Sequence, residues 1–584
     1  MKKQISKKLL CLLTVILSGF SGFGQIPATA NEVLFKDWNY SSSGVFGLVK
    51  LVNPEQRKYY KIFKTNNETA KIQEYNAAGM LMNSTLIRYV NGKLNQMTFT
   101  NRWGDTYEIT KFTVAGPDEF IVTKKNTGEN PYLPCKGARY IYRNNQLAEI
   151  RYISYANKVT TNSSGVAIIK YKRYTDKNRF SLLKEMAFYD ADSKPVISTS
   201  YDCHKVIYEY DESGNQVSIA YYGTDNEPLT NRYGGFKGRN HYDENDKLIS
   251  SETIGINDEI TNNAYGVART TNEYRNGFLS GSTRFNDRGN IAKASDAGDG
   301  IAIISYKYDA NGNEISRSYF DEKNDPMNNH SGFHKALYTY DSRDMLTSTA
   351  YYDRDGAPAA DRKGIYKYVY VKDDKGRTIE LSYFDKSNEP VQDDGDEVYM
   401  VKYKYDEWGR VVSRSFWKNS NTKMNRWNGA HENISKYNSE GRVIETLILD
   451  QSGNQFITKS GYSRTVTGYN TEARVSEYKY FNNDLPASLD SGFTNKFHAV
   501  KFYYDANGRL ASLKYFDKDG QPVNAFIDME DGFECHKVEF VYKGNTIVEE
   551  KIYLKNSDAP SRVIDCLKND YISTSGVSKG YKNR

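Results

Sequence analysis

Short runs of apolar and aromatic residues, separated by polar turns, recur along most of this chain. One example is KALYTY, from Lys335 to Tyr340, which the turn DSRD separates from MLTSTAYY, ending at Tyr352. Runs of roughly six to eight residues that are rich in β-branched and aromatic side chains favour β-strands. Two such runs joined by a short polar turn predict an antiparallel hairpin. The pattern therefore predicts an all-β protein.

These hairpins recur at a nearly constant distance. The residue before the first turn of each unit, usually a tyrosine, is called its anchor here, and successive anchors lie about 32 residues apart. The anchors are Tyr142, Tyr174, Tyr210, Tyr242, Tyr274, Tyr308, Tyr340, Lys372, Tyr405, Tyr437, Tyr469, Tyr504 and Tyr542. A single hairpin is marginally stable, so each unit must pack on its neighbours. We expect tandem β-hairpin repeats that form an extended or spiralling β-sheet array.

Each unit carries two turn motifs. The first, as in YDANGNE from Tyr308, places Asp at the first turn position and Gly at the fourth. The second, as in YDRDGAP from Tyr352, ends in a proline that cannot donate to a β-ladder. A three-residue loop with a glycine bulge would place Tyr306 opposite Ser316. Glycine accepts a positive φ without steric cost, and we expect one at Gly214, Gly312, Gly409 and Gly508.

The chain divides into four predicted segments. Residues 1–30 place lysines before an apolar run from Leu9 to Leu17, which is the layout of a secretory signal peptide and is too short for a membrane span. An N-terminal β-rich capping region (31–130), the tandem repeats (131–555) and a polar C-terminal tail (556–584) follow. We expect a secreted, periplasmic or outer-surface protein without a transmembrane segment.

Composition and charge narrow the function. The chain holds 49 tyrosines against 26 phenylalanines and 5 tryptophans, which suits half-buried sheet surfaces with solvated hydroxyls. Loss of the four lysines in residues 1–24 lowers the formal net charge from +6 to +2. A nearly neutral chain with interspersed charges offers no electrostatic surface for nucleic acid. We therefore expect no nucleic-acid partner.

The first turn motif resembles a known repeat. YDANGN from Tyr308 and YDANGR from Tyr504 are similar to the tyrosine–aspartate repeats of Rhs-type bacterial proteins. The resemblance covers roughly residues 131–555, and it implies a spiralling β-sheet that can close into a shell in secreted, surface or toxin-delivery proteins. Two features depart from that family: the unit is longer, with two turn motifs, and no Asp-Pro-x-Gly segment stands near the end. We therefore expect no toxin payload.

Histidine, cysteine and aspartate are the candidates for chemistry. Five histidines lie six residues before an anchor: His204, His334, His431, His498 and His536. A residue that recurs with the repeat is expected to pack against the aromatic residue of the next strand, and a metal or ligand role along the ladder is the alternative. Cys535 and Cys566 lie about one unit apart and can form a disulfide in an exported protein. The aspartates occupy turn positions and not a calcium loop, so we expect no metal and no cofactor.

Three functions remain open. The main prediction is an exported, non-enzymatic binding or scaffold module for an extracellular glycan or surface protein. Its candidate ligand-binding residues are Tyr351, Tyr383, Trp417 and Tyr515, and the alternative for each is packing on the neighbouring unit. The second function is a shell or adhesin component of a Rhs-like toxin-delivery system without its own toxin domain. The third is a polysaccharide hydrolase with its site in residues 31–130, although no catalytic motif is present.

Overall fold

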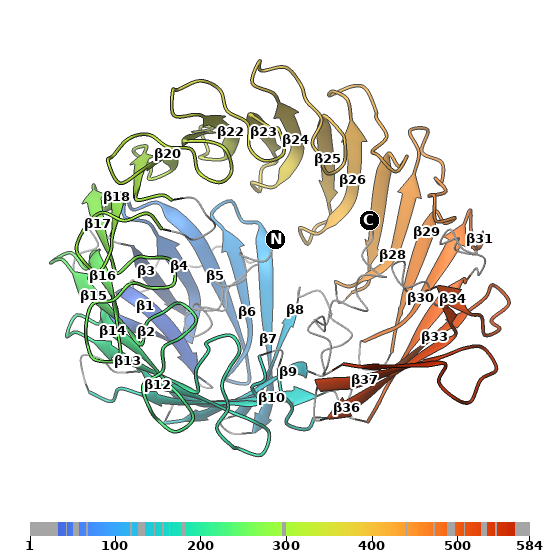
Figure 1. The fold of residues 1–584 in the computed structure, drawn as a ribbon, viewed down its shortest axis with the longest axis horizontal. Coiled ribbons are helices and arrows are strands. Elements are labelled where there is room, and N and C mark those ends of the chain that lie inside the picture. The colour runs from blue at the N-terminus through green and yellow to red at the C-terminus, as the bar shows by residue number, and fades with distance from the viewer. Residues whose placement is uncertain are drawn as a thin grey trace. The chain divides into compact units, whose positions relative to one another are not determined.

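The computed structural model describes residues 33–41, 44–50, 58–65, 68–116, 119–125, 135–144, 146–154, 157–162, 164–176, 181–294, 300–439, 441–470, 474–487, 497–506, 509–526, 534–543 and 546–566. The predicted signal peptide, Gly508 and the end of the tail lie outside these residues. Every regular element that the structure describes is a β-strand, which confirms the all-β prediction (Figure 1). The boundaries of the predicted segments remain predictions.

The chain forms two compact units. Unit 1 comprises Met1–Lys125, Gly137–Tyr152 and Ser164–Gly395, and unit 2 comprises Asn126–Lys136, Ile153–Ser163 and Asp396–Arg584.

The strands up to β24 lie wholly or mainly in unit 1: β1 (Val33–Ser41), β2 (Gly44–Lys50), β3 (Tyr59–Thr65), β4 (Glu68–Tyr75), β5 (Leu81–Val90), β6 (Lys93–Asn101), β7 (Thr106–Gly116), β8 (Glu119–Lys125), β9 (Cys135–Arg143), β10 (Gln146–Ser154), β11 (Ile168–Arg173), β12 (Leu183–Tyr189), β13 (Lys205–Tyr210), β14 (Gln216–Tyr222), β15 (Lys237–Tyr242), β16 (Leu248–Ile254), β17 (Arg269–Arg275), β18 (Phe278–Phe285), β19 (Ile303–Tyr308), β20 (Glu314–Phe320), β21 (Lys335–Tyr340), β22 (Leu346–Tyr352), β23 (Lys367–Lys372) and β24 (Thr378–Phe384).

The remaining strands belong to unit 2: β25 (Met400–Tyr405), β26 (Val411–Trp417), β27 (Glu432–Tyr437), β28 (Val443–Leu449), β29 (Arg464–Tyr469), β30 (Val475–Asn482), β31 (Leu485–Pro486), β32 (Ala499–Tyr504), β33 (Leu510–Phe516), β34 (Ala525–Phe526), β35 (Glu534–Cys535), β36 (Lys537–Lys543), β37 (Thr546–Tyr553) and β38 (Arg562–Asp565).

Most consecutive strands pair antiparallel within each unit, so the sheet grows one hairpin at a time; β1 also pairs with β3, β30 with β32, and β33 with β36. Within the repeats, a long ladder joins the two strands of each hairpin, and a short ladder of three residue pairs joins it to the next hairpin. The predicted array of hairpins with a period of about 32 residues is therefore confirmed.

A β-bulge sits at the anchor of each regular hairpin. Tyr308 pairs with Glu314, but Lys307 pairs with Ser316, so Ile315 is the extra residue. The same shift follows anchors from Tyr210 to Tyr542. The sequence-based register was wrong by one residue, because a bulge inserts one unpaired residue and moves every later pair. Tyr306 consequently lies opposite Arg317 and not opposite Ser316.

The first turn is built as predicted. One carboxylate oxygen of Asp309 accepts hydrogen bonds from the backbone N–H groups of Asn311 and Asn313, both at 2.9 Å. A short acceptor side chain can stabilise a turn in this way, and glycine then adopts the left-handed conformation at the fourth position. The φ angles of Gly214, Gly312 and Gly409 are 79°, 81° and 74°, as expected.

Two more turns of this kind can follow the first turn within one repeat, one more than the sequence predicted. In the unit of β21 and β22, Asp353 accepts from the backbone N–H groups of Asp355 and Ala357, and Asp361 accepts from those of Lys363 and Ile365. The third turn occupies the stretch that sequence alone described only as polar and glycine-containing.

The anchor tyrosines recur because their hydroxyls satisfy a backbone group at the preceding bulge. The hydroxyl of Tyr437 donates to the carbonyl of Val411 at 2.8 Å, and that of Tyr469 donates to Val443 at 2.8 Å. The accepting residue is the one that pairs with the previous anchor across the bulge, as Val411 pairs with Tyr405. A buried carbonyl without a hydrogen-bond partner destabilises the fold. Tyrosine can donate a hydrogen bond to this carbonyl, and phenylalanine cannot.

We expect Tyr437→Phe to destabilise its hairpin by about 1 kcal/mol, because it removes one hydrogen bond and leaves a carbonyl unsatisfied. Native-state hydrogen exchange of the amides in β26 and β27 measures this change. Tyr403→Phe is the matched control, since the Tyr403 hydroxyl makes no hydrogen bond among the described residues. Equal effects of the two variants would show that the anchor hydroxyl has no structural role.

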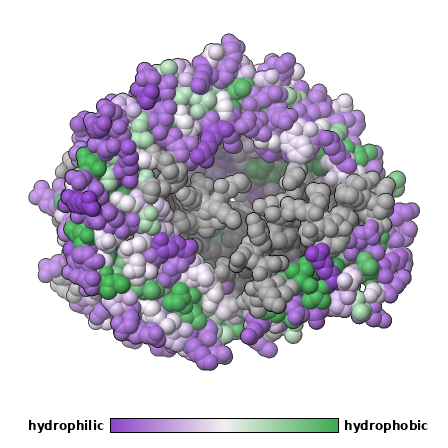
Figure 2. All heavy atoms as spheres, viewed as in Figure 1, coloured by the Kyte–Doolittle hydropathy of each residue, from purple (hydrophilic) through white to green (hydrophobic). Residues whose placement is uncertain are grey.

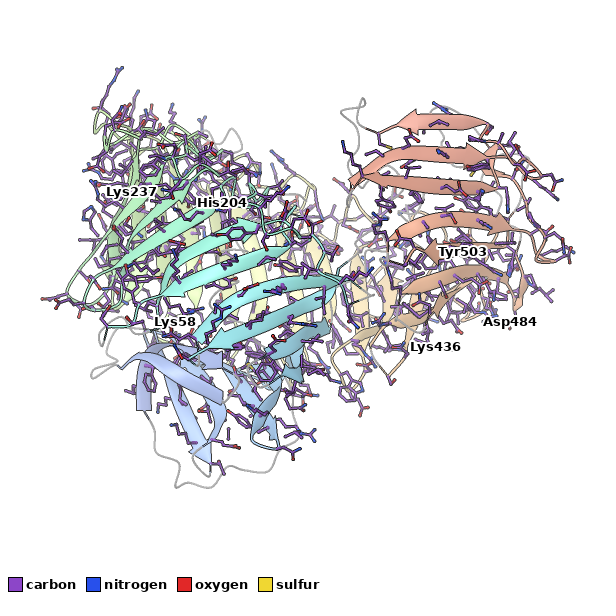
Figure 3. All side chains as sticks on the ribbon, turned by 90° about the horizontal axis from the view of Figure 1, so that it is seen from below. Lys58, His204, Lys237, Lys436, Asp484 and Tyr503 are labelled. Atoms are coloured by element: carbon purple, nitrogen blue, oxygen red, sulfur yellow. The ribbon has the colours of Figure 1, made fainter. Side chains whose placement is uncertain are left out.

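Each unit has its own apolar core. In unit 1, residues of β3–β9 such as Met97 and Phe120 pack with residues of β11–β14 such as Phe188 and Tyr208. In unit 2, the core gathers residues of β30–β37, including Val500 and Leu513. Side chains project from both faces of the strands, as seen around Lys237 and Tyr503 (Figure 3).

Candidate functional site

The two faces of the repeat hairpins differ in composition. Side chains alternate between the faces along a strand, and the pairing of β21 with β22 sorts them. We call the face that continues the unit 1 core the core face; in this hairpin it carries Ala336, Tyr338, Tyr340, Thr349 and Tyr351. The opposite face carries Lys335, Leu337, Thr339, Ser348 and Tyr352.

The four predicted ligand-binding residues do not form one row. Tyr351, Tyr383 and Tyr515 follow their anchors by eleven residues and share the core-face position, whereas Trp417 follows its anchor by twelve. A shift of one residue moves a side chain to the other face. Tyr383 and Tyr515 are only 6% and 3% exposed. The expected exposure is therefore wrong for Tyr383 and Tyr515, whereas ligand binding by the four residues stays a prediction.

The other two candidates also contact neighbouring residues. Tyr351 stacks on Phe333 with ring centroids 4.2 Å apart. Trp417 meets His431 edge to face at 5.5 Å, and the ammonium of Lys402 lies 4.4 Å from its ring centroid. These contacts are packing contacts within and between neighbouring hairpins. Such packing was the alternative to ligand binding for each residue.

The recurring histidines pack on aromatic rings. Each ring meets edge to face an aromatic residue at or next to the end of the second strand of the preceding hairpin, whereas an aromatic residue of the next strand was expected. The pairs are His204 with Tyr189, His334 with Phe320, His431 with Trp417, His498 with Phe481, and His536 with Phe516. Burial lowers the pKa of His536. No group of three or more His, Cys, Asp or Glu that could hold a metal ion occurs among the described residues.

Three cysteines are buried thiols. Cys203, Cys535 and Cys566 are free, so Cys535 and Cys566 do not form the disulfide that their spacing allowed. Burial raises the pKa of Cys203 to about 12, and Cys203 is 0% exposed.

We expect native Cys203 to resist iodoacetamide at pH 8, because alkylation requires an accessible thiolate. Peptide mass spectrometry of native and guanidinium-unfolded protein measures this, and the unfolded protein should be labelled fully at the same residue. Complete labelling of Cys203 in the native protein would contradict the buried environment described here.

A cluster of tyrosines on the core face of β19–β22 forms the best candidate surface. We call Tyr306, Tyr319, Tyr338 and Tyr351, with Arg317, the tyrosine surface. All five side chains are half-buried. The hydroxyls of the four tyrosines make no hydrogen bond to any described residue, and none of them is fully enclosed. Burial raises the pKa of Tyr338 to about 12, so these hydroxyls are protonated donors at neutral pH.

The ring faces of the tyrosine surface are largely occupied. The guanidinium of Arg317 lies 5.3 Å from the ring centroid of Tyr306 and is held by Glu314 through two hydrogen bonds of 2.9 Å. Tyr319 and Tyr351 both contact Phe333. The hydroxyl tips are thus the groups left to bind a partner, and the rings are fixed by their neighbours.

A second candidate feature lies within unit 1, where turns of the N-terminal hairpins rest on turns of the repeats. Asn76 donates to the carbonyl of Asn311 at 3.0 Å, and Asn101 donates to that of Lys375 at 3.2 Å. Arg102 donates to the carbonyl of Asp344 at 2.6 Å. We call these contacts, together with those of Trp103 and Asp105, the clasp.

The clasp also uses an aromatic ring and an ion pair. The indole N–H of Trp103 donates to the carbonyl of Arg343 at 3.0 Å, and Asp105 lies 3.8 Å from the guanidinium of Arg377. A Cβ added to Gly376 would lie 2.4 Å from Cε3 of Trp103, so the indole packs directly on this glycine. Strands β3 to β24 thus curl back until early and late turns meet (Figure 1). Sequence analysis missed the clasp.

The visible described atoms are mostly hydrophilic, with apolar residues scattered among them (Figure 2). Among the described residues, no helix has the length and hydropathy to cross a membrane.

Comparisons with known proteins give a distant structural likeness. No family model matches the chain, and no curated protein matches its sequence. The Tc holotoxin pore of Photorhabdus luminescens is similar over 86% of this chain and 28% of that chain, with 10% identity and a TM-score of 0.31. TcdB2-TccC3 without its hypervariable C-terminal region is similar over 85% of this chain and 26% of that chain, with 10% identity and a TM-score of 0.32.

This chain thus spans between a quarter and a third of the length of these two solved chains. Likenesses at these TM-scores do not establish a shared function, so the site is interpreted from its own residues.

Proposed function

We propose that this protein is an exported, non-catalytic shell component whose unit 1 holds a partner polypeptide against the tyrosine surface. The observation that carries the proposal is the set of four half-buried tyrosine hydroxyls without a hydrogen-bond partner among the described residues. Tyrosine supplies a rigid contact area and a polar tip, which is why it is enriched at protein interfaces. The clasp supports the shell role, since it closes unit 1 upon itself.

The same geometry favours a polypeptide over a glycan. Sugar rings bind aromatic side chains mainly by stacking on their faces, and one face of Tyr306 is occupied by Arg317 and one face of Tyr351 by Phe333. Hydroxyl tips can instead pair with the backbone N–H and C=O groups of an extended chain. The shell function is therefore placed ahead of the glycan-binding function.

A hydroxyl-deletion variant tests this proposal. Tyr306→Phe, Tyr319→Phe, Tyr338→Phe and Tyr351→Phe, combined, keep the packed rings and remove the four hydroxyls. The full-length protein and this variant are titrated with each polypeptide encoded beside the gene, and both are screened on a glycan array. Each lost hydrogen bond is worth about 0.5–1.5 kcal/mol, so we expect affinity for one polypeptide to fall at least about tenfold.

Tyr503→Phe, an exposed tyrosine of unit 2, is the control and should bind normally. The proposal is wrong if none of these polypeptides binds, or if the folded fourfold variant binds as tightly as the parent.

A further inference from the structure

We propose that the clasp is a reversible gate of unit 1, which opens without unfolding the repeat ladder and gives access to the tyrosine surface. The opening step stands on the contacts of the clasp alone. Only the identity of what enters rests on the proposed function.

The clasp differs in kind from the rest of the sheet. In the clasp, side chains from turns of the N-terminal hairpins form hydrogen bonds with turns of the repeats. No strand pairing joins these two groups of turns among the described residues. The ladder between β21 and β22, in contrast, pairs six residues on each strand. Local opening occurs first where few cooperative contacts must break. The N-terminal turns can therefore separate from the repeat turns at the clasp while the hairpins stay intact.

The clasp also docks at a defined place, because Arg102 bonds to Asn313 and Asp344 and lies near the anchor Tyr340. The repeats of unit 2 place arginines of their own near their anchors. In unit 2, the guanidinium of the arginine five residues after an anchor lies over the ring of the next anchor tyrosine. The distances from guanidinium to ring centroid are 4.6 Å for Arg410 on Tyr437, 5.5 Å for Arg442 on Tyr469, 3.9 Å for Arg474 on Tyr504 and 4.6 Å for Arg509 on Tyr542.

Between the anchors Tyr210 and Lys372 of unit 1, only Lys372 is followed by an arginine at this position, Arg377; the others are followed by Asn215, Lys247, Leu279, Asn313 and Met345. Arg102 comes in from the N-terminal hairpins to donate to the side chain of Asn313 at 3.2 Å. Burial raises the pKa of Tyr340 to about 12, and the nearby charge of Arg102 acts in the opposite direction. The clasp arginine thus places a guanidinium near Asn313 and Tyr340, in a hairpin that has no arginine of its own at this position.

The gate lies beside the tyrosine surface. Arg102 and Asn76 contact the turns that end β19 and β21, and Tyr306 and Tyr338 stand on these two strands, two residues before the anchors. The clasp is therefore at the turn end of the tyrosine surface, and in the proposed gate its release widens access to this end.

Nitration by tetranitromethane, combined with hydrogen exchange of the full-length protein, tests the gate without any partner. Arg102→Ala removes two hydrogen bonds of a charged donor, so the open fraction should rise about tenfold or more. We expect faster nitration of Tyr306 and Tyr338 and faster exchange in residues 309–313 and 341–345. The ladder amides of β21 and β22 should be unchanged.

Two controls make the outcome decisive. Arg88→Ala changes an exposed arginine of the same hairpins and should leave both rates as in the parent, and Tyr503 in unit 2 should be nitrated equally in all variants. If the clasp turns exchange only as fast as the ladder in the parent, or if Arg102→Ala leaves nitration unchanged, the gate is wrong. Failure of polypeptide binding with normal gating would instead reject only the proposed partner.

Discussion

Tyr515→Ala is expected to destabilise unit 2 by about 3–5 kcal/mol, the range for large buried aromatic side chains cut to alanine. Tyr515 is 3% exposed and belongs to the core that includes Val500, Leu513 and Phe540. Its ring also meets Phe497 edge to face, with centroids 5.1 Å apart. Guanidinium unfolding, followed by the circular dichroism of the sheet, measures the loss.

The matched control is Tyr503→Ala in the same hairpin. Tyr503 points to the opposite face and is 40% exposed, so its replacement should cost less than about 1 kcal/mol. Similar unfolding curves for the two variants would mean that Tyr515 is not a core residue, and its role as a ligand-binding residue would then have to be reconsidered.

Gly376→Ala is expected to break the clasp. Its φ of +79° is unfavourable for alanine, and the added methyl group would collide with the indole of Trp103 at 2.4 Å. The backbone term alone is roughly 1–2 kcal/mol, and displacement of the indole adds to it. Hydrogen exchange in residues 101–105 and 373–377 should therefore increase.

Gly364→Ala separates the two effects. Gly364 has a similar φ of +76°, but nothing lies within 4 Å of an added Cβ. This variant should carry the backbone cost without faster exchange in residues 101–105. If the two glycine variants change exchange there equally, the indole does not rest on Gly376.

Much of the repeat could be predicted from sequence because its determinants are local. An aspartate that accepts from the backbone two and four residues later, and a glycine at the fourth position, specify a turn within five residues. The positive φ of Gly312 follows directly from this turn.

The sequence-based predictions of strand register and of side-chain face were wrong where one extra residue shifts the strand pairing. The bulge residue Ile315 shifts the strand pairing by one, and sequence analysis did not allow for it beyond the anchor. The four candidate ligand residues do not share one face for a related reason: Tyr351 and Trp417 differ by one position relative to their anchors, which places them on opposite faces. Counting positions from each anchor is enough to separate these two residues on sequence alone.

The clasp could not be predicted, because it has no periodic signal. Arg102 and Asp344 are 242 residues apart in sequence, and the turn NRWGD at Asn101 looks like an ordinary hairpin turn. The absence of arginine five residues after an anchor does not mark the place either, because Asn215, Lys247 and Leu279 stand at this position just as Asn313 and Met345 do.

Photo-crosslinking from position 103 tests most directly the claim that unit 1 closes upon itself through the clasp. With p-benzoylphenylalanine in place of Trp103 in the full-length protein, irradiation should crosslink this residue to the segments around Arg343 and Gly376, since the native indole contacts both. The same probe at position 88, an exposed residue of the same hairpins, should not reach these segments. Crosslinks from position 103 that avoid residues 341–377 altogether would contradict the closed unit.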